Sequence, residues 1–565
     1  MSADDGSRRV GWLRPALAAA AVAALAWTST VPGGWGAGQG GTRATGPGSA
    51  GEDVGGSSGA ATAGTSGDAA ADASPEGEQA LVEQAALACA GRDGLAGRAL
   101  AVTAPEQLLV EDGPGEGSLQ VLGPQGAADP VPLGEAAAGV PLAAGDSALV
   151  SATGGDAAGL VAGQVLVGVG TEQTGTSPRG AVLSGCVAPA EDQWLLAGGA
   201  EPGRTESLVL TNPGADPVRV DVELRGEAGP VRVTGGAGLV VPAGGRLVRP
   251  VDALADGVQA PALGVRAEGG PVAAQLVETY RDGTTELGTS VTSPAAAPAR
   301  DLVVPPVPSG EDGRDLVLRV LAPEGAAVVE LGSVTGTGPA TPDPAAVRVP
   351  AGSTVDVPLA ALDEGAAGLR LRADAPVTAS LQVRLAPSGD EPLEGAQEDG
   401  GTGTDEAAAT TGAPDAATTT EPADGSAADD PEVVRPAGDL AWLPATALAA
   451  GPLGIAVPEL TDVPGARVEL SLAALDATTA EVLLQTSEGA TTSRTLDLAN
   501  DTSALVEVPA GTSAVWVRPA GPTMPGLAAA LHLTGQDDLG PYRAATTLRP
   551  VPWTREVTTI TSVVP

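Results

Sequence analysis

The chain has 565 residues, too many for a single core, and a typical size of roughly 100–200 residues per domain predicts three to five domains. It has 70 acidic and 29 basic residues and a net charge of −41. Nucleic acid and anionic lipid headgroups repel such a polyanion, so we expect neither as a partner.

The first 37 residues have the pattern of an export signal. Three arginines precede an apolar run from Pro15 to Trp27, and small residues follow it. The run has 13 residues, fewer than the roughly 20 that span a bilayer. We therefore expect residues 1–37 to be a cleaved signal peptide, with an uncleaved anchor as the alternative. The rest of the chain is then secreted or in the cell envelope, and it would contact a membrane only through this segment.

A linker is predicted to follow the signal. Residues 38–75 are mostly Gly, Ala, Ser, Thr and Asp. Such a segment buries too little apolar surface to offset its backbone entropy, so we expect a disordered tether. Ser74-Pro75-Glu76 then resembles a helix start, and we predict a short helix that ends near Ala88.

The first predicted domain, residues 76–200, contains the only two cysteines, Cys89 and Cys186. An even pair behind an export signal indicates one disulfide in an oxidising compartment. Closing a loop of this length would contribute about 4–5 kcal/mol in the chain-entropy model. A metal or catalytic pair is the weaker alternative, because no histidine lies nearby and the spacing is not C-x-x-C.

Short strands broken by Gly and Pro dominate the rest of the chain. Val218–Arg225 alternates apolar and charged residues with period two, which is typical of a strand with one buried face. Asn212–Pro217 before it has the composition of a turn. We therefore expect Leu208–Leu210 and Val218–Leu224 to be neighbouring strands.

Internal repetition is the main architectural feature. A Val-Pro-Ala-Gly turn begins at Val241, Val349 and Val508, with a looser copy at Val140. A matching strand follows each turn and begins at Val161, Val272, Val377 and Leu527.

These strand starts are 111, 105 and 150 residues apart, and the last interval contains an acidic tract, residues 390–435. A unit of about 105 residues with short strands has the size of an immunoglobulin-like sandwich. We therefore predict an all-β fold of about four tandem immunoglobulin-like β-sandwich repeats, in which residues 201–300, 301–389 and 436–565 follow the disulfide-bridged domain.

The acidic tract has 13 Asp or Glu and no Arg between residues 390 and 434. It stands where the second repeat has the short hairpin Arg281-Asp282-Gly283. We expect a disordered surface insertion, since loop-closure entropy grows only slowly with length. A calcium-loaded arm and a glycosylated spacer are alternatives without a specific motif.

The sequence offers little for catalysis. His532 is the only histidine and lies at a strand position. We find no nucleophile elbow, phosphate-binding loop or metalloprotease motif, and we predict no catalytic, cofactor or metal site. Asp221 and Glu223 would lie about 7 Å apart on one strand face, a spacing that a pair of glycosidase carboxylates could have. Alternating charge on a solvated sheet face explains them better.

Four tryptophans beyond the tether are candidates for binding: Trp194, Trp442, Trp516 and Trp553. Trp194 and Trp442 stand just before a predicted repeat begins, and Trp553 stands near the end of the last one. These places favour a role for the tryptophans in filling the junctions between sandwiches. An exposed indole ring would instead face a ligand and stack on a sugar.

The chain resembles a family of exported actinobacterial proteins known only by a domain-of-unknown-function label. The resemblance rests on Cys186, Pro189 and Trp194, on Leu208–Gly214, and on the motifs Val240–Gly244 and Val272–Ala274. It covers most of the chain after the signal and implies no activity, and no functional residue is carried over.

Together these features predict a non-enzymatic secreted or cell-envelope protein that acts as a structural or interaction scaffold. The alternative is an array of carbohydrate-binding modules for wall or capsule glycan. The sequence leaves the partner open between envelope proteins and wall glycan.

Overall fold

Strands and the turns between them make up the part of the chain that the computed structural model describes. The described residues are 78–108, 115–134, 137–168, 181–283, 285–309, 314–359, 366–385, 438–449, 451–463, 465–520, 526–537 and 540–557. They belong to one compact unit, Glu78–Pro565. They form several small antiparallel sheets and one curled mixed sheet, so the all-β prediction is confirmed. The predicted signal peptide, the tether and the acidic insertion lie outside the described residues, and the predicted domain boundaries stay predictions.

The predicted short helix is wrong. Its residues form β1 (Glu78–Leu81) and β2 (Gln84–Cys89) instead. β2 pairs along its length with β8 (Ser147–Gly154). Alanine and leucine favour a helix only slightly, and pairing within a sheet overrides that preference.

Four stretches of strands share one topology, and we call them repeats 1 to 4. Repeat 1 contains β2, β3 (Leu95–Val102), β4 (Gly115–Gly123), β5 (Gly126–Ala127), β6 (Val131–Pro132), β7 (Ala137–Leu142), β8, β9 (Val161–Gly168) and β10 (Ala181–Gly185). Repeat 2 contains β11 (Asp192–Leu196), β12 (Arg204–Thr211), β13 (Val218–Gly226), β14 (Gly229–Val231), β15 (Leu239–Val241), β16 (Arg246–Pro250), β17 (Ala262–Glu268), β18 (Ala273–Asp282) and β19 (Thr285–Thr292). Repeat 3 contains β20 (Ala299–Pro308), β21 (Arg314–Ala322), β22 (Ala327–Thr335), β23 (Gly338–Ala340), β24 (Ala346–Val349), β25 (Ser353–Leu359), β26 (Ala366–Leu385) and β27 (Asp439–Pro444). Repeat 4 contains β28 (Leu453–Ala456), β29 (Arg467–Ala474), β30 (Thr478–Thr486), β31 (Thr491–Leu498), β32 (Thr502–Val508), β33 (Thr512–Ala520), β34 (Leu527–Asp537) and β35 (Gly540–Thr547).

Each repeat is a pair of sheets around an apolar core. One sheet has the orders β2-β8-β4-β5, β11-β17-β13-β14, β20-β26-β22-β23 and β28-β33-β30-β31 in repeats 1 to 4. The other has the orders β7-β3-β9-β10, β16-β12-β18-β19, β25-β21-β26-β27 and β32-β29-β34-β35. In repeat 3 the unbroken strand β26 belongs to both sheets, where the other repeats use two strands. Core residues from both sheets pack together in every repeat.

The matching strands predicted from the sequence occupy equivalent places. They are β9, β18, the second half of β26 and β34, each next to the last strand of its repeat.

The Val-Pro-Ala-Gly turn does not occupy the same position in every repeat. It joins β15 to β16 and β24 to β25 in repeats 2 and 3, whereas in repeat 4 it joins β32 to β33. A short turn of this chemistry serves any strand connection, so it marks turns and not repeat positions.

The alternation predicted for β13 is confirmed, because its apolar residues are buried and the charged residues between them are not. The expectation that β12 and β13 are neighbours is wrong. β12 pairs with β16 and β18, whereas β13 belongs to the facing sheet. The connection turns between the sheets at Asn212, whose side chain binds backbone groups of the turn and of β15.

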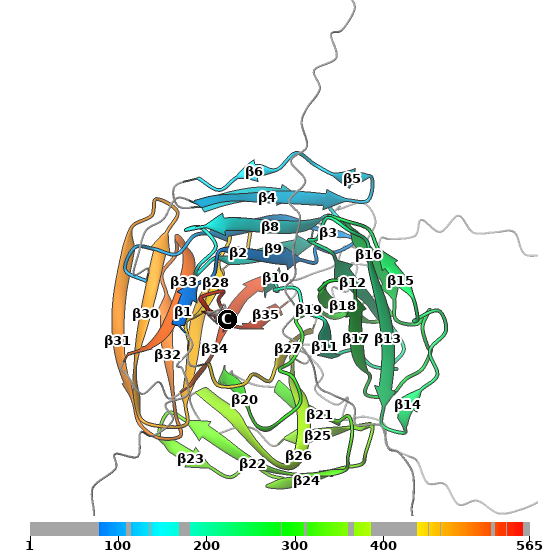
Figure 1. The fold of residues 1–565 in the computed structure, drawn as a ribbon. Coiled ribbons are helices and arrows are strands. Elements are labelled where there is room, and N and C mark those ends of the chain that lie inside the picture. The colour runs from blue at the N-terminus through cyan, green and yellow to red at the C-terminus, as the bar shows by residue number, and fades with distance from the viewer. Residues whose placement is uncertain are drawn as a thin grey trace, which may run out of the picture. The chain divides into compact units, whose positions relative to one another are not determined.

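The last strand of each repeat contacts the last strands of two other repeats. β10 contacts β35, β35 contacts β27, β27 contacts β19, and β19 contacts β10, so the contacts form a closed cycle. The four strands lie together in Figure 1. Each pairs with the strand before it in its repeat, and in repeat 3 that pairing joins Leu385 to Asp439. The described strands on either side of the acidic tract therefore pair at the hairpin position expected from the sequence.

The two ends of the described unit also meet. β1 pairs with β37 (Thr554–Val557), and β36 (Arg549–Pro550) pairs with β28. Trp516 of repeat 4 is buried, and its indole N–H donates to the carbonyl of Gly159, 3.0 Å away in repeat 1. Repeat 4 thus packs against repeat 1 as well as repeat 3.

The disulfide predicted from the sequence is present. Cys89 ends β2 and Cys186 follows β10, and the two cysteines are 97 positions apart in the sequence. Next to it, Ala88 and Val187 form a β-bridge. The bond therefore ties the first strand of repeat 1 to its last.

Close approach between repeats 1 and 4 gives a first prediction. A Cβ added to Gly163 of β9 would lie 2.1 Å from the carbonyl oxygen of Ala456 on β28. Gly163→Ala should therefore lower the free energy of unfolding by about 1–3 kcal/mol, the usual cost of overpacking. Gly332→Ala is the control, because a Cβ there meets no atom within 4 Å. Equal urea midpoints for the two variants would contradict this close packing.

Candidate functional site

Two paired strands of repeat 2 carry charged residues on their core-facing side. In the register of β12 and β18, Glu206 lies opposite Glu278, between the pairs Arg204–Tyr280 and Leu208–Leu276. Arg204, Glu206 and Glu278 are all buried. Side chains that lie directly opposite on one face are about 4.5–5.5 Å apart at their Cβ atoms, so two carboxyl groups are forced together here.

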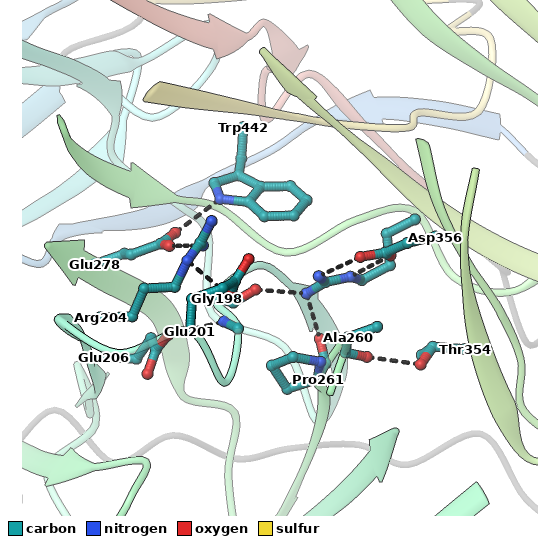
Figure 2. Close-up of polar contacts among 12 residues, drawn as sticks. Gly198, Glu201, Arg204, Glu206, Ala260, Pro261, Glu278, Thr354, Asp356 and Trp442 are labelled. Carbon is teal, nitrogen blue, oxygen red and sulfur yellow. Dashed lines mark hydrogen bonds and ion pairs between the residues drawn. The ribbon is translucent and has the colours of Figure 1, made fainter. Parts of the chain in front are cut away.

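Arg204 neutralises one of these carboxylates. Its guanidinium pairs with Glu278 Oε1 and also, at 3.0 Å, with the partly exposed Glu201. Glu278 Oε2 accepts a 2.7 Å hydrogen bond from the indole N–H of Trp442, which comes from β27 of repeat 3. Figure 2 shows these contacts side by side. Burial acts to lower the pKa of Arg204, but the nearby carboxylates outweigh it and raise that pKa above its ordinary value.

Glu206 has no cation of its own. Its Oε1 accepts a hydrogen bond from the backbone N–H of Gly199, and no ion pair reaches it among the described residues. In Figure 2 it lies on the far side of Arg204 from Trp442. Burial, followed by repulsion from Glu278, raises the pKa of Glu206 to about 7.

A small pocket borders Glu206. It has a volume of about 190 Å³. Its acidic lining is Glu206, Glu201, Asp252 and Asp256, and the turns at 199–203 and 255–258 supply most of the rest. Glu206 is buried, whereas the other three carboxylates are exposed at the rim. Arg204 is the only basic residue in the lining, and it is already paired.

A second buried arginine fastens this region to repeat 3. Arg319 of β21 binds Asp356 through two 2.8 Å contacts, and its Nη1 donates to the carbonyls of Gly198 and Pro261 in repeat 2. Its guanidinium also lies 4.8 Å from the ring centre of Trp442. Gly198, just before the pocket, and Pro261 in its lining are therefore held in place by an arginine of repeat 3.

The family model DUF5719, a family of unknown function, matches residues 136–427, which is more than half of the chain. The chain belongs to the DUF5719 family. The resemblance to a domain-of-unknown-function family is thus confirmed. No curated protein matches the chain.

The DUF5719 match includes Arg204, Glu206 and Glu278 and ends before Trp442. It runs from β7 of repeat 1 through the described part of β26. Repeat 4 lies beyond it, although its strand order is that of the other three repeats.

All four tryptophans of this DUF5719 chain lie at junctions between repeats. Trp442 packs in the core of repeat 2 and Trp516 against strands of repeat 1, and both are buried. They therefore do not face a ligand, which corrects that expectation for these two residues. Trp194 packs beside Leu321 of repeat 3, and Trp553 packs near Gly159. These two are only half-buried, and a ligand-facing role for them stays a prediction.

The other residues singled out in the sequence lie apart from the pocket. Asp221 accepts a hydrogen bond from Gly238, and the exposed Glu223 pairs with Arg225. His532 lies buried on β34, with its Nε2 2.9 Å from the carbonyl oxygen of Pro306. Burial, assisted by the charge of Arg543, lowers the pKa of His532 to about 3.

The described residues offer neither a membrane-spanning helix nor a cluster of potential metal ligands. No helix there is long and apolar enough to cross a membrane. No group of three or more His, Cys, Asp or Glu side chains in the same residues could hold a metal ion.

The raised pKa of Glu206 predicts how stability depends on pH. The folded protein binds this proton more tightly than the unfolded chain, whose glutamate titrates near 4.5. The stabilisation is therefore complete below pH 4.5 and is lost as the pH rises through about 7. We expect Glu206→Gln to remove this loss and to be more stable than the wild type at pH 8, by on the order of 3 kcal/mol.

Urea unfolding at pH 4.5 and pH 8 measures this difference. Glu268→Gln is the matched control, because it removes an exposed carboxylate from the same repeat. A Glu206→Gln protein with the same pH dependence as the wild type would refute a buried, unpaired carboxyl group.

Proposed function

We propose that this protein is a non-enzymatic, extracytoplasmic scaffold whose four repeats act as one rigid body for interactions with other envelope components. The closed cycle of contacts among β10, β35, β27 and β19 is the observation that carries the proposal. Each repeat is also fastened to the next by buried polar groups, such as Glu278 with Trp442 and Ser471 with Pro306. Such contacts cost free energy unless they are fully paired, so they favour a single arrangement of the repeats.

The extracytoplasmic location is supported by the disulfide and by the signal pattern of residues 1–37. Disulfides persist in oxidising compartments and are rare in the cytosol. Fractionation of the producing cells, with mass spectrometry of the mature N-terminus, tests this part of the proposal. We expect the protein in the envelope or the medium, with its thiols oxidised. Recovery from the cytosol with free thiols at Cys89 and Cys186 would overturn it.

The scaffold role predicts stable protein neighbours and no turnover. Cross-linking in intact cells, followed by purification through the C-terminus, should recover a reproducible set of envelope proteins. Hydrolysis of wall polymers by the wild type, lost in Asp221→Asn and Glu223→Gln, would overturn the non-enzymatic assignment.

Wall glycan remains the second candidate partner, because Trp194 and Trp553 keep part of their surface exposed. Isolated wall glycan should then retain the protein, and oligosaccharide should change its tryptophan fluorescence. Failure of both tests would dispose of this candidate.

A further inference from the structure

The pocket beside Glu206 combines two independent features. Its rim is acidic, and its floor holds a carboxyl group that is 5 % exposed and has no counter-ion. An acidic rim alone is common on a chain with a net charge of −41. A buried carboxyl group without a counter-ion is not, because an ionised group in a protein interior needs a compensating charge or a proton.

Cross-strand pairing explains why the carboxylate of Glu206 has no cation to compensate its charge. Glu206 and Glu278 face each other from β12 and β18, and Arg204 supplies one positive charge for the two of them. Glu278 uses both its oxygens, one on Arg204 and one on Trp442. Glu206 therefore keeps Oε2 free of hydrogen bonds and ion pairs within the described residues, at the wall of a pocket.

We propose that this pocket binds an organic monocation, the guanidinium or ammonium head of a basic side chain or of a small amine. Glu206 would pair with the cation at the floor, and Glu201, Asp252 and Asp256 would attract it at the rim. A planar guanidinium can pair with a carboxylate through two hydrogen bonds, which suits a single buried acid. The volume of about 190 Å³ holds several water molecules and exceeds what a bare metal ion needs.

The shape of the loop above Glu206 supports a preformed site. Gly198 has a φ of +86°, and a Cβ there would come within 2.8 Å of Glu206 Oε1. Gly198 O is held in turn by Arg319 from repeat 3. A site fixed in this way needs little rearrangement on binding, which favours affinity.

Binding should depend on pH because the cation requires the ionised carboxylate. The charged groups around Glu206 are Glu278 on β18, Arg204 on β12, Asp252 after β16, and Glu201 and Asp256 at the rim. Burial and repulsion from Glu278 raise the pKa of Glu206 to about 7. Affinity should therefore be constant above pH 8 and fall roughly tenfold for each pH unit below the pKa.

Titration calorimetry on the full chain with methylguanidinium chloride, at matched ionic strength and pH 8, tests the proposal. We expect a dissociation constant of about 1 mM or tighter for the wild type, as suits so small a ligand. Glu206→Gln should weaken binding at least about tenfold, whereas Glu268→Gln should leave it within about twofold. The Glu206→Gln protein is expected to be well folded, so loss of binding would not reflect unfolding.

The source of the cation is resolved by a second titration, with a short arginine-containing peptide. Binding much tighter than that of methylguanidinium would assign the site to a polypeptide partner, and equal binding would assign it to a free amine. Both outcomes support the proposal, provided that Glu206→Gln weakens the binding at least about tenfold.

Three outcomes would overturn the proposal: no binding of methylguanidinium, equal weak binding by all three proteins, or displacement of the cation by calcium at equal concentration. The first two would leave only general attraction to an acidic surface, and the third would indicate an inorganic cation site. None of them bears on the scaffold proposal, which rests on different contacts.

Discussion

Replacing Arg204 with methionine is expected to lower the free energy of unfolding by about 3–5 kcal/mol, the typical cost of removing one partner from a buried ion pair. Methionine keeps much of the arginine stem and removes the guanidinium group with its charge and its hydrogen-bond donors. The Glu278 side chain, which is 0 % exposed, would then face the buried Glu206 with no cation between them. The loss should be greatest above pH 8 and smaller near pH 5, where protonation can relieve the repulsion.

Arg266→Met in the same repeat is the control for this prediction. Arg266 pairs with Asp192 at 3.0 Å, but the two side chains are 73 % and 69 % exposed. Exposed pairs of this kind contribute about 0–1 kcal/mol. Chemical denaturation at pH 8 compares the two variants, and similar midpoints would mean that the buried cluster does not hold repeats 2 and 3 together.

Breaking the disulfide is the second change with a large expected effect. The double variant Cys89→Ala, Cys186→Ala should lose about 2–5 kcal/mol, the range found when native disulfides are removed. The bond joins the two end strands of repeat 1, and without it those strands lose their covalent link and keep sheet pairing, core packing and the bridge next to the bond. The loss should appear as a lower thermal midpoint.

Treatment with a reductant is the internal control for the effect of the disulfide. Reducing the wild type should lower its thermal midpoint to that of the double variant, whereas the double variant should not respond. A wild type that is insensitive to reductant, or that titrates two free thiols before reduction, would contradict a stabilising disulfide.

The repeat architecture could be predicted from the sequence because it rests on local patterns. The period-two strand at Val218–Arg225 has one buried face. The matching strands near Val272 and Val377 are instead runs of residues that are mostly buried on both faces. The association of the repeats could not be predicted in this way. It depends on contacts between residues hundreds of positions apart, such as Trp516 with Gly159.

The candidate site was missed, although the sequence contains a sign of it. Glu206 lies two residues before Leu208 and Glu278 two residues after Leu276, so each continues an inward-facing row of apolar residues. A carboxylate in such a row indicates a buried charge. Which two strands pair, and therefore that the two acids meet, became visible only in the structure.

For two of the tryptophans, a role could be predicted from the sequence but burial could not. The sequence favours a junction role for Trp442 and Trp516, but it cannot separate a buried ring from an exposed one. Trp442 is buried because Glu278 satisfies its indole N–H, and Trp516 because Gly159 does. These partners come from other repeats, beyond the reach of any local pattern.

The pairing of β1 with β37 has a consequence for how such a protein can evolve. In an open solenoid each unit touches only its neighbours, so duplication can lengthen the array by one copy without loss. Here the final copy must meet the first, and an inserted or deleted copy would leave two unmatched faces exposed to water. Gene duplications that change the copy number should therefore be strongly selected against, and variation should instead accumulate in hairpins such as the one that carries the acidic tract.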